Sequence, residues 1–402
     1  MATPRRARLQ TTEGGSTVTT LELFFDLVFV FALTQVTALM AAETSGTGLF
    51  RGALILTVLW WCWIGYSWLT NVVRADEGVM RVGMFLAMGV MFVAAVTIPE
   101  SFDDLPGGLS GPVVFAACYF AFRLIHIGMY LLVSRDDPGL RRQVVRFAAP
   151  MTFGTVMLLI ASQTTGALQI ALWCVAIIGD LGGTMLSGTD WKLASPAHFA
   201  ERYGLIVIVA LGESIVATGI GIAQEPISWQ IVGASALALT VSAALWWSYF
   251  DVTVLLTERA FAATQGVQRI LLARNGYTFL HLPMIIGIIL MSLGLKTVLG
   301  YVAGYDDHTL TDPIYGLPLV ALYGGAALFL AAHAWFTWMV AREIKRERLA
   351  VVVVLLALIP AVWTLPAIAT LGVLALVLVA MIGWETYRYA EQRHRIRHAE
   401  GH

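Results

Sequence analysis

Two carboxylates stand at the start of the first long apolar stretch of the chain. Glu22 and Asp26 lie four residues apart in a run of Leu, Phe, Val and Ala, so a helix would place them on one face. A charged side chain near the centre of a bilayer costs about 2.5 to 3.5 kcal/mol on insertion scales. A helix that only faced lipid would not need them. They therefore indicate a polar interior that binds an ion, moves a proton or meets a substrate.

A second apolar stretch carries Tyr119, Arg123, His126 and Tyr130, which are spaced by four, three and four residues and share a helical face. An arginine is not stable when it faces lipid, so we expect it to pair with a carboxylate. Such a pair would either fix the register of two helices or lie on a path for substrate or protons. Both alternatives stay open. The carboxylates that could pair with Arg123 are Glu22, Asp26, Asp180 and Glu213.

Glu213 lies near the middle of the apolar segment 203–223, in a stretch, 210–221, that is rich in Gly, Ala and Ser. Small residues allow helices to approach closely or to unwind locally, and transport sites are often built in such places. The alternative is a packing face with a hydrogen-bonded glutamate. Glu201 and Arg202 come just before this stretch and could cap its helix or line a cytoplasmic opening.

Histidines add groups that titrate near neutral pH, and they suit either a proton relay or hydrogen-bonded packing. His126, His281 and His333 lie on separate stretches, and the chain has no HExxH motif. We therefore expect no metal site and no cofactor. The residues predicted for a substrate or ion pathway are Glu22, Asp26, Arg123, His126, Asp180, Glu201, Arg202, Glu213, His281 and His333.

The composition places these groups in a membrane protein. The chain is 58% hydrophobic and 13% charged, whereas soluble domains have about 25% charged residues. A net charge of −1 argues against a nucleic-acid partner. We predict an all-α fold, a polytopic transmembrane bundle of about twelve spans whose partners are membrane lipid and a small solute or ion. Assembly as a homo-oligomer stays open. The apolar segments are 19–42, 48–70, 80–98, 112–134, 147–163, 167–187, 203–223, 227–250, 274–297, 314–341, 348–363 and 366–387.

Charged loops predict the orientation. A cytoplasmic N-terminus puts 22 of the 25 Lys and Arg residues on the cytoplasmic side, as the positive-inside rule requires. The opposite loops are acidic and include Asp306, Asp307 and Asp312. We therefore predict a multipass protein of the cell membrane with both termini in the cytoplasm. The ionisable residues within spans then fall in the middle or the cytoplasmic half, which predicts a polar cavity open to the cytoplasm.

The two halves of the chain resemble each other. Trp60-Trp61 corresponds to Trp246-Trp247, and His126 and His333 each precede an arginine by nine residues. We predict two six-span pseudo-repeats in the same orientation. The predicted organisation is a disordered N-tail (1–18), a first transmembrane half (19–187), a second half (203–387) and a basic tail (388–402).

Three motifs resemble the bacterial low temperature requirement protein A (LtrA) family. They are LELFFDLVFV at 21–30, HFAERY at 198–203 and LGES at 211–214, and the likeness extends over roughly residues 17–390. The resemblance implies a multipass integral membrane protein and no established catalytic set. It marks the motif positions Glu22, Asp26, Glu201, Arg202 and Glu213 as candidate functional residues.

Three functions remain as alternatives. The first is a secondary transporter or an ion or proton pathway with a carboxylate-lined interior. The second is a membrane-embedded enzyme that acts on a lipid-like or isoprenoid substrate from the cytoplasmic side, with histidines and carboxylates as acid and base. The third is a non-catalytic membrane component whose buried charges only fix its packing.

Overall fold

The computed structural model describes residues 17–186, 188–222, 226–304 and 308–391. Most of the predicted N-tail and basic tail, and the acidic pair Asp306 and Asp307, lie outside these residues. The chain forms two compact units, one of Met1–Val36 with Phe50–Arg202 and the other of Thr37–Leu49 with Tyr203–His402. The two units are described separately below.

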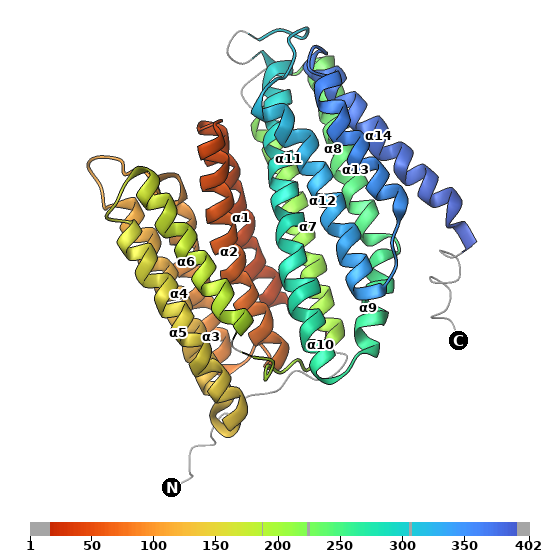
Figure 1. Ribbon diagram of the computed structural model, residues 1–402. Helices are drawn as coiled ribbons and strands as arrows, with labels where there is room; N and C mark the ends of the chain where they lie inside the picture. Colours follow the sequence, from red (N-terminus) through yellow and green to blue (C-terminus); the bar gives the residue numbers. More distant parts are fainter. Residues whose placement is uncertain (1–16, 187, 223–225, 305–307, 392–402) are drawn as a thin grey trace. The chain divides into compact units, whose positions relative to one another are not determined.

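Long apolar helices dominate the described part of the chain (Figure 1), and eleven of them are long and apolar enough to cross a membrane. This confirms the predicted all-α, polytopic fold class. Six of the eleven belong wholly or largely to the first unit: α1 (Thr20–Ala42), α2 (Gly46–Val72), α3 (Gly78–Val96), α4 (Gly111–Val133), α5 (Pro138–Ala161) and α6 (Gly166–Leu186).

The remaining helices belong to the second unit, apart from the start of α7. The last predicted span forms α14, whereas the eleventh forms a separate helix, α13, of only 16 residues. At 1.5 Å per residue, α13 is about 24 Å long, shorter than the roughly 30 Å hydrocarbon core. These helices are α7 (Pro196–Ile220), α8 (Trp229–Phe250), α9 (Thr253–Ala263), α10 (Gly266–Leu272), α11 (Leu280–Ala303), α12 (Leu317–Ala341), α13 (Arg346–Ala361) and α14 (Ala367–Arg388).

Helix α5 begins nine residues before the predicted span at 147. The side chain of Asp137 accepts hydrogen bonds from the backbone N–H groups of Gly139 and Leu140, both at 3.1 Å, and so caps the helix. The first turns of α5 contain Arg141, Arg142 and Arg146, so the hydropathy is low there although the backbone is helical. Long arginine side chains can extend from these turns to polar surroundings. The apolar pattern therefore marks where this helix meets lipid, not where it begins.

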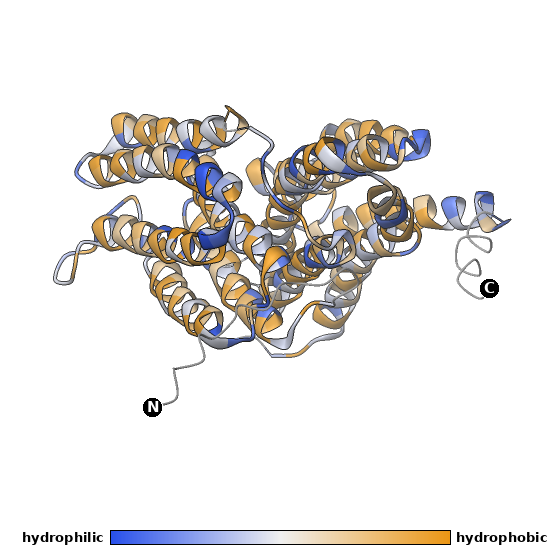
Figure 2. Cartoon of the chain, turned by 90° about the horizontal axis from the view of Figure 1, so that it is seen from below, coloured by the Kyte–Doolittle hydropathy of each residue, from blue (hydrophilic) through white to orange (hydrophobic). Residues whose placement is uncertain are grey.

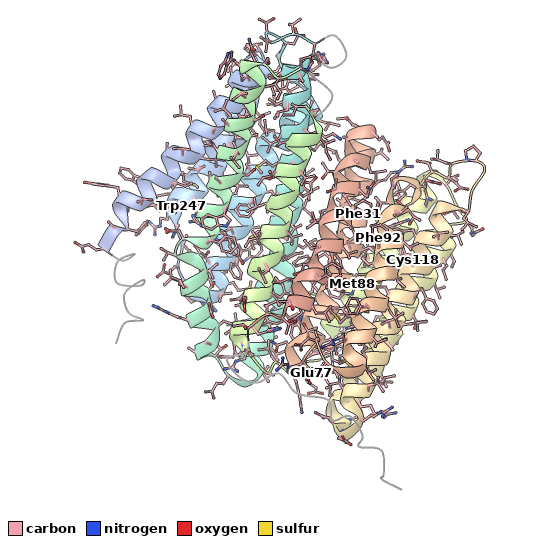
Figure 3. All side chains as sticks on the ribbon, turned by 180° about the vertical axis from the view of Figure 1, so that it is seen from behind. Phe31, Glu77, Met88, Phe92, Cys118 and Trp247 are labelled. Atoms are coloured by element: carbon pink, nitrogen blue, oxygen red, sulfur yellow. The ribbon has the colours of Figure 1, made fainter. Side chains whose placement is uncertain are left out.

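Aromatic and small side chains join the helices of the first unit. Phe31 of α1 stacks on Phe92 of α3 with ring centroids 5.2 Å apart (Figure 3). Helices α5 and α6 approach closely where a Cβ on Gly183 would come within 2.2 Å of the Pro150 side chain. Hydrophobic residues cover most of each helix (Figure 2), as expected where side chains face either each other or lipid.

Two helices of the second unit, α11 and α12, meet at glycines. A Cβ on Gly287 would lie 2.6 Å from the carbonyl oxygen of Gly325, so only glycine allows the two backbones this close. Just before α11, the chain adopts a π-helical segment, η3 (Ala273–Phe279). π-Helical turns are rare and occur often at functional sites. This one carries Tyr277 and Thr278 into the buried interior.

Candidate functional site

Arg202 is the centre of a buried ionic cluster in the first unit. Its two terminal nitrogens each lie 3.0 Å from one carboxylate oxygen of Asp26, a bidentate ion pair. One of these nitrogens also donates to the backbone carbonyl of Glu22 at 3.1 Å. The indole N–H of Trp63 donates to Asp26 at 2.9 Å. The side chains of Arg202 and Asp26 are 0% and 3% exposed, so every charge in the pair is removed from water.

Glu22 extends this cluster. The Nε2 atom of His198 lies 3.1 Å from one carboxylate oxygen of Glu22, and the backbone N–H and the hydroxyl of Thr19 donate to the other at 2.9 Å. The amide nitrogen of Asn71 lies 3.3 Å from Nδ1 of His198. Because an amide nitrogen can only donate, Nδ1 accepts and Nε2 bears the hydrogen that points to Glu22.

The structure thus brings together three of the predicted residues, Glu22, Asp26 and Arg202. Glu201 is not part of the cluster, because its side chain is exposed and accepts a hydrogen bond from the backbone N–H of Val18 at 3.0 Å. His198 was not among the predicted site residues. Its spacing of four from Arg202 would have placed both on one helical face and could have identified it.

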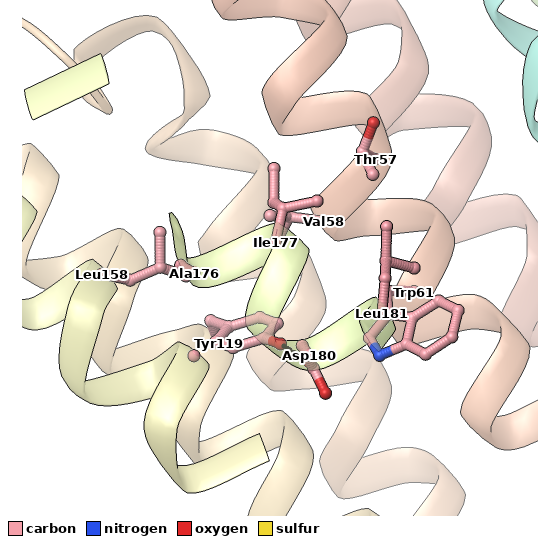
Figure 4. A pocket seen from close by; sticks show the side chains of 10 residues that line it. Thr57, Val58, Trp61, Tyr119, Leu158, Ala176, Ile177, Asp180 and Leu181 are labelled. Atoms are coloured by element: carbon pink, nitrogen blue, oxygen red, sulfur yellow. Dashed lines mark hydrogen bonds between the residues drawn. The ribbon is translucent and has the colours of Figure 1, made fainter. Parts of the chain in front are cut away.

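A second ion pair in the first unit joins Arg123 of α4 to Asp180 of α6. One terminal nitrogen of Arg123 lies 3.2 Å from both oxygens of Asp180, and the hydroxyl of Tyr119 donates to the same carboxylate at 2.6 Å. Of the four carboxylates considered from the sequence, Asp180 is therefore the partner. Figure 4 shows Tyr119, Asp180 and Trp61 around a small cavity that has room for about one water molecule.

His126 lies on the same helix as Arg123 but does not join this pair. Its ring packs against Tyr66, with centroids 5.3 Å apart, and against the backbone of Gly65, where an added Cβ would approach within 2.9 Å. No hydrogen bond of ordinary geometry reaches either ring nitrogen from the described residues. Among the described residues, Arg202, Asp26 and Glu22 form no ion pair or hydrogen bond with Arg123 or Asp180.

Glu213 lies in the second unit, in the middle of α7, and is fully buried. The hydroxyls of Thr37 and Ser292 lie near its carboxyl group, the charged group that acts on it is Lys296, and no described residue makes a hydrogen bond of ordinary geometry to either carboxylate oxygen. Within the described residues, no cation lies within 4 Å of it. The next residue, Ser214, shares a hydroxyl–hydroxyl hydrogen bond of 2.8 Å with Ser242 of α8. Glu213 is thus surrounded by neutral polar groups and not by a guanidinium.

His281 and His333 both lie beside Tyr249 in the second unit. Nε2 of His281 lies 2.8 Å from the hydroxyl of Tyr249, and the ring of His333 packs on the Tyr249 ring with centroids 5.4 Å apart. Nδ1 of His333 meets the guanidinium of Arg348, which can only donate, so Nδ1 is the acceptor. The structure therefore brings these two predicted histidines to one aromatic side chain.

Arg348 and Glu385 form a further buried ion pair that the sequence analysis missed. The guanidinium of Arg348, at the start of α13, lies 2.7 and 2.8 Å from the two oxygens of Glu385 near the end of α14. It also donates to the carbonyl of Ser248 at 2.9 Å. Arg348 was counted as a loop charge because it begins an apolar segment. The signal that could have found the pair is Glu385, a carboxylate within the last predicted span.

The described residues contain no group of three or more His, Cys, Asp or Glu side chains arranged to hold a metal ion. What the geometry offers instead is a set of buried carboxylates. Asp26, Asp180 and Glu385 are each paired with an arginine. Glu22 lies beside both His198 and Arg202, and Glu213 has no arginine partner among the described residues.

The family model of the bacterial low temperature requirement A protein (LtrA) matches residues 17–383 of this chain. A curated relative from Rhizobium meliloti (strain 1021), named Uncharacterized protein RA0937, is 28% identical to it, and the match covers 94% of this chain and 90% of the relative. No solved structure matches the chain. The predicted motif positions at 21–30, 198–203 and 211–214 all fall within the matched region.

Proposed function

We propose that this chain, which belongs to the bacterial low temperature requirement A protein (LtrA) family, is a secondary transporter or an ion or proton pathway. Glu213 is the group that exchanges a proton or a small cation during each passage. The membrane protein has many apolar helices, and its buried acids are the features that a lipid-facing scaffold does not need.

The observation that carries the proposal is the environment of Glu213. A buried carboxyl group without a guanidinium partner can be protonated or can bind a cation without breaking an ion pair. The hydroxyls of Thr37 and Ser292 can accept a hydrogen bond from the protonated group or provide oxygen ligands to a cation.

The paired carboxylates have another role in this proposal. Asp26 is held by two charge-assisted hydrogen bonds from Arg202, and Asp180 by Arg123 and Tyr119. Releasing either carboxylate would deprive a buried guanidinium of its nearest counter-charge, which is strongly unfavourable. These pairs therefore hold helices in register while Glu213 changes state.

The test is proton movement in reconstituted vesicles that contain a pH-sensitive dye and carry an imposed membrane potential. We expect wild-type protein to move protons, or to move a cation at a rate set by pH, and Glu213→Gln to lose at least about tenfold in rate. Glu391→Gln makes the same chemical change at an exposed position and should behave as wild type. A folded Glu213→Gln protein with the wild-type rate would contradict the proposal.

In this proposal both termini face the cytoplasm of a bacterial inner membrane, because that orientation places most Lys and Arg residues on the cytoplasmic side. A reporter enzyme that is active only outside the cytoplasm, fused after His402, should be silent. An active fusion would reverse the orientation.

A further inference from the structure

A pocket of about 230 Å3 lies in the second unit, where α8, α12 and α14 end. Its polar lining consists of Asp251, Glu343, Lys345, Glu385 and the hydroxyphenyl ring of Tyr389, and Leu256 and Ile344 provide apolar walls. The pocket thus has room for several waters or for a small organic molecule.

The charges around the pocket favour a cation. Three carboxylates line it, against the ammonium of Lys345 and the guanidinium of Arg348 behind Glu385. Together these groups leave one excess negative charge. Three long helices end at the pocket, while the shorter α9 and α13 begin there. Helix C-termini carry partial negative charge, so the helix dipoles favour the same sign.

Lys345 shows how an ammonium group can be held in this pocket. Its Nζ atom lies 3.5 Å from a carboxylate oxygen of Glu385 and 5.7 Å from the centroid of the Tyr389 ring. A carboxylate on one side and an aromatic face on the other are the usual surroundings of a bound ammonium ion. Lys345 is largely buried, and this burial, together with the positive charge of Arg348, lowers the pKa of its ammonium group. A ligand's ammonium could therefore compete with it for the same partners.

We propose that this pocket, between Asp251, Glu343, Glu385 and Tyr389, binds a small organic ammonium ion. The apolar walls at Leu256 and Ile344 contact the carbon skeleton of the ligand, and the carboxylates and the aromatic ring contact its charged group. This site lies apart from the role proposed for Glu213 and does not depend on it.

The test is calorimetric titration of the purified, detergent-solubilised full chain with choline and with putrescine. The neutral control is 3,3-dimethylbutan-1-ol, which has the shape of choline with carbon in place of the charged nitrogen, and the anionic control is acetate. We expect saturable binding of at least one of the two cations and an affinity at least about tenfold lower for both controls. Equal binding of the neutral analogue, binding of acetate alone, or no binding of either cation would overturn the proposal.

The binding affinities of three variants test where the cation binds and whether negative charge attracts it. Glu343→Gln should weaken cation binding about fivefold to tenfold, because it removes one facing negative charge. Lys345→Met should strengthen binding, because it removes a competing ammonium; a site for anions would instead lose its ligand. Glu77→Gln, in the first unit, should leave the affinity unchanged. Because Lys345→Met predicts a gain, misfolding cannot imitate the expected result, and loss of binding in a folded Lys345→Met protein would contradict the proposal.

The outcome is separable from that of the vesicle experiment. Glu213→Gln should bind the cation as wild type does, even if it no longer moves protons. A protein that transports normally but binds no ammonium ion would refute only the pocket.

Discussion

Asp26 and Glu213 are both fully or almost fully buried acids on apolar helices, yet their surroundings differ in kind. Asp26 receives two hydrogen bonds from Arg202 and one from Trp63, all between 2.9 and 3.0 Å. Glu213 faces two hydroxyl-bearing residues, and no cation lies within 4 Å of it among the described residues. The first acid is held in place by its partner, whereas the second can change state without leaving a guanidinium unpaired.

This difference separates two uses of buried charge. An ion pair such as Asp26–Arg202 adds specificity to helix packing, but it contributes little net stability because both groups had to leave water. Breaking it is costly, since one uncompensated charge remains. An acid without a cation has no such constraint and is therefore suited to exchange. Substitutions that remove charge should affect the two positions very differently.

The largest effect is expected for Arg202→Met. The substitution leaves Asp26 buried without its cation and removes the donor to the Glu22 carbonyl. We expect the free energy of unfolding to fall by about 3 to 5 kcal/mol, measured by denaturant titration in mixed micelles. The double variant Asp26→Leu/Arg202→Met should recover part of the loss, because Asp26 then carries no unpaired charge, whereas Glu22 still loses the guanidinium that lies 3.9 Å away. A double variant less stable than Arg202→Met would show that the pair itself stabilises the fold.

Tyr119→Phe should have an intermediate effect. The hydroxyl of Tyr119 donates to the carboxylate of Asp180 at 2.6 Å while Arg123 supplies the counter-charge. Losing one hydrogen bond to a charged group lowers the free energy of unfolding by about 1.5 to 3 kcal/mol, in the same denaturant titration. Tyr130→Phe removes the same hydroxyl about three turns further along the same face of α4. It should cost less, because no described residue forms a hydrogen bond with the Tyr130 hydroxyl. If both variants lower the free energy of unfolding equally, the hydrogen bond from Tyr119 to Asp180 contributes no extra stability.

The sequence predicted which acidic residues are buried far better than it predicted which side chains form ion pairs with each other. Glu22, Asp26 and Glu213 stand out because a carboxylate is expensive within an apolar stretch, and this cost is local to the residue. The partner of Arg123 depends on which helices become neighbours, and four carboxylates satisfied the sequence equally well. The way the helices pack determines that Asp180 is the partner of Arg123.

The Arg348–Glu385 pair was missed for the same physical reason. Both residues lie near ends of apolar segments, where charges are common and usually face water or lipid headgroups. Only the antiparallel packing of α13 and α14 brings the beginning of one helix to the end of the other. The start of α5 was misplaced because hydropathy measures lipid contact and does not register the Asp137 cap.

Asp137 extends the comparison to an acid at a helix end that water reaches. It caps α5 and pairs with Lys192, and these hydrogen bonds hold the pKa of its carboxyl below the usual value. A lowered pKa contributes stability that is present above the unfolded-state value near pH 4 and is lost as pH falls through the folded-state value. Asp137→Ala should lower the free energy of unfolding by about 1 kcal/mol at pH 7. As pH falls below about 4, the difference between the variant and wild type should shrink; a constant difference across this range would exclude the charge as the cause.

Glu213→Gln should have the smallest effect on stability, and it is the sharpest test of the comparison. Glutamine keeps the shape of glutamate and can hydrogen-bond to the hydroxyls of Thr37 and Ser292, and no cation within 4 Å loses a partner. We expect a change of less than about 1 kcal/mol in the free energy of unfolding. Asp26→Asn is the matched variant, since it also replaces a carboxylate by an amide, but it removes the bidentate partner of the buried Arg202 guanidinium and leaves only Glu22, 3.9 Å away, as a counter-charge. If the two variants are destabilised alike in the same micelles, Glu213 is as firmly held as Asp26, and its availability for exchange is disproved before any transport is measured.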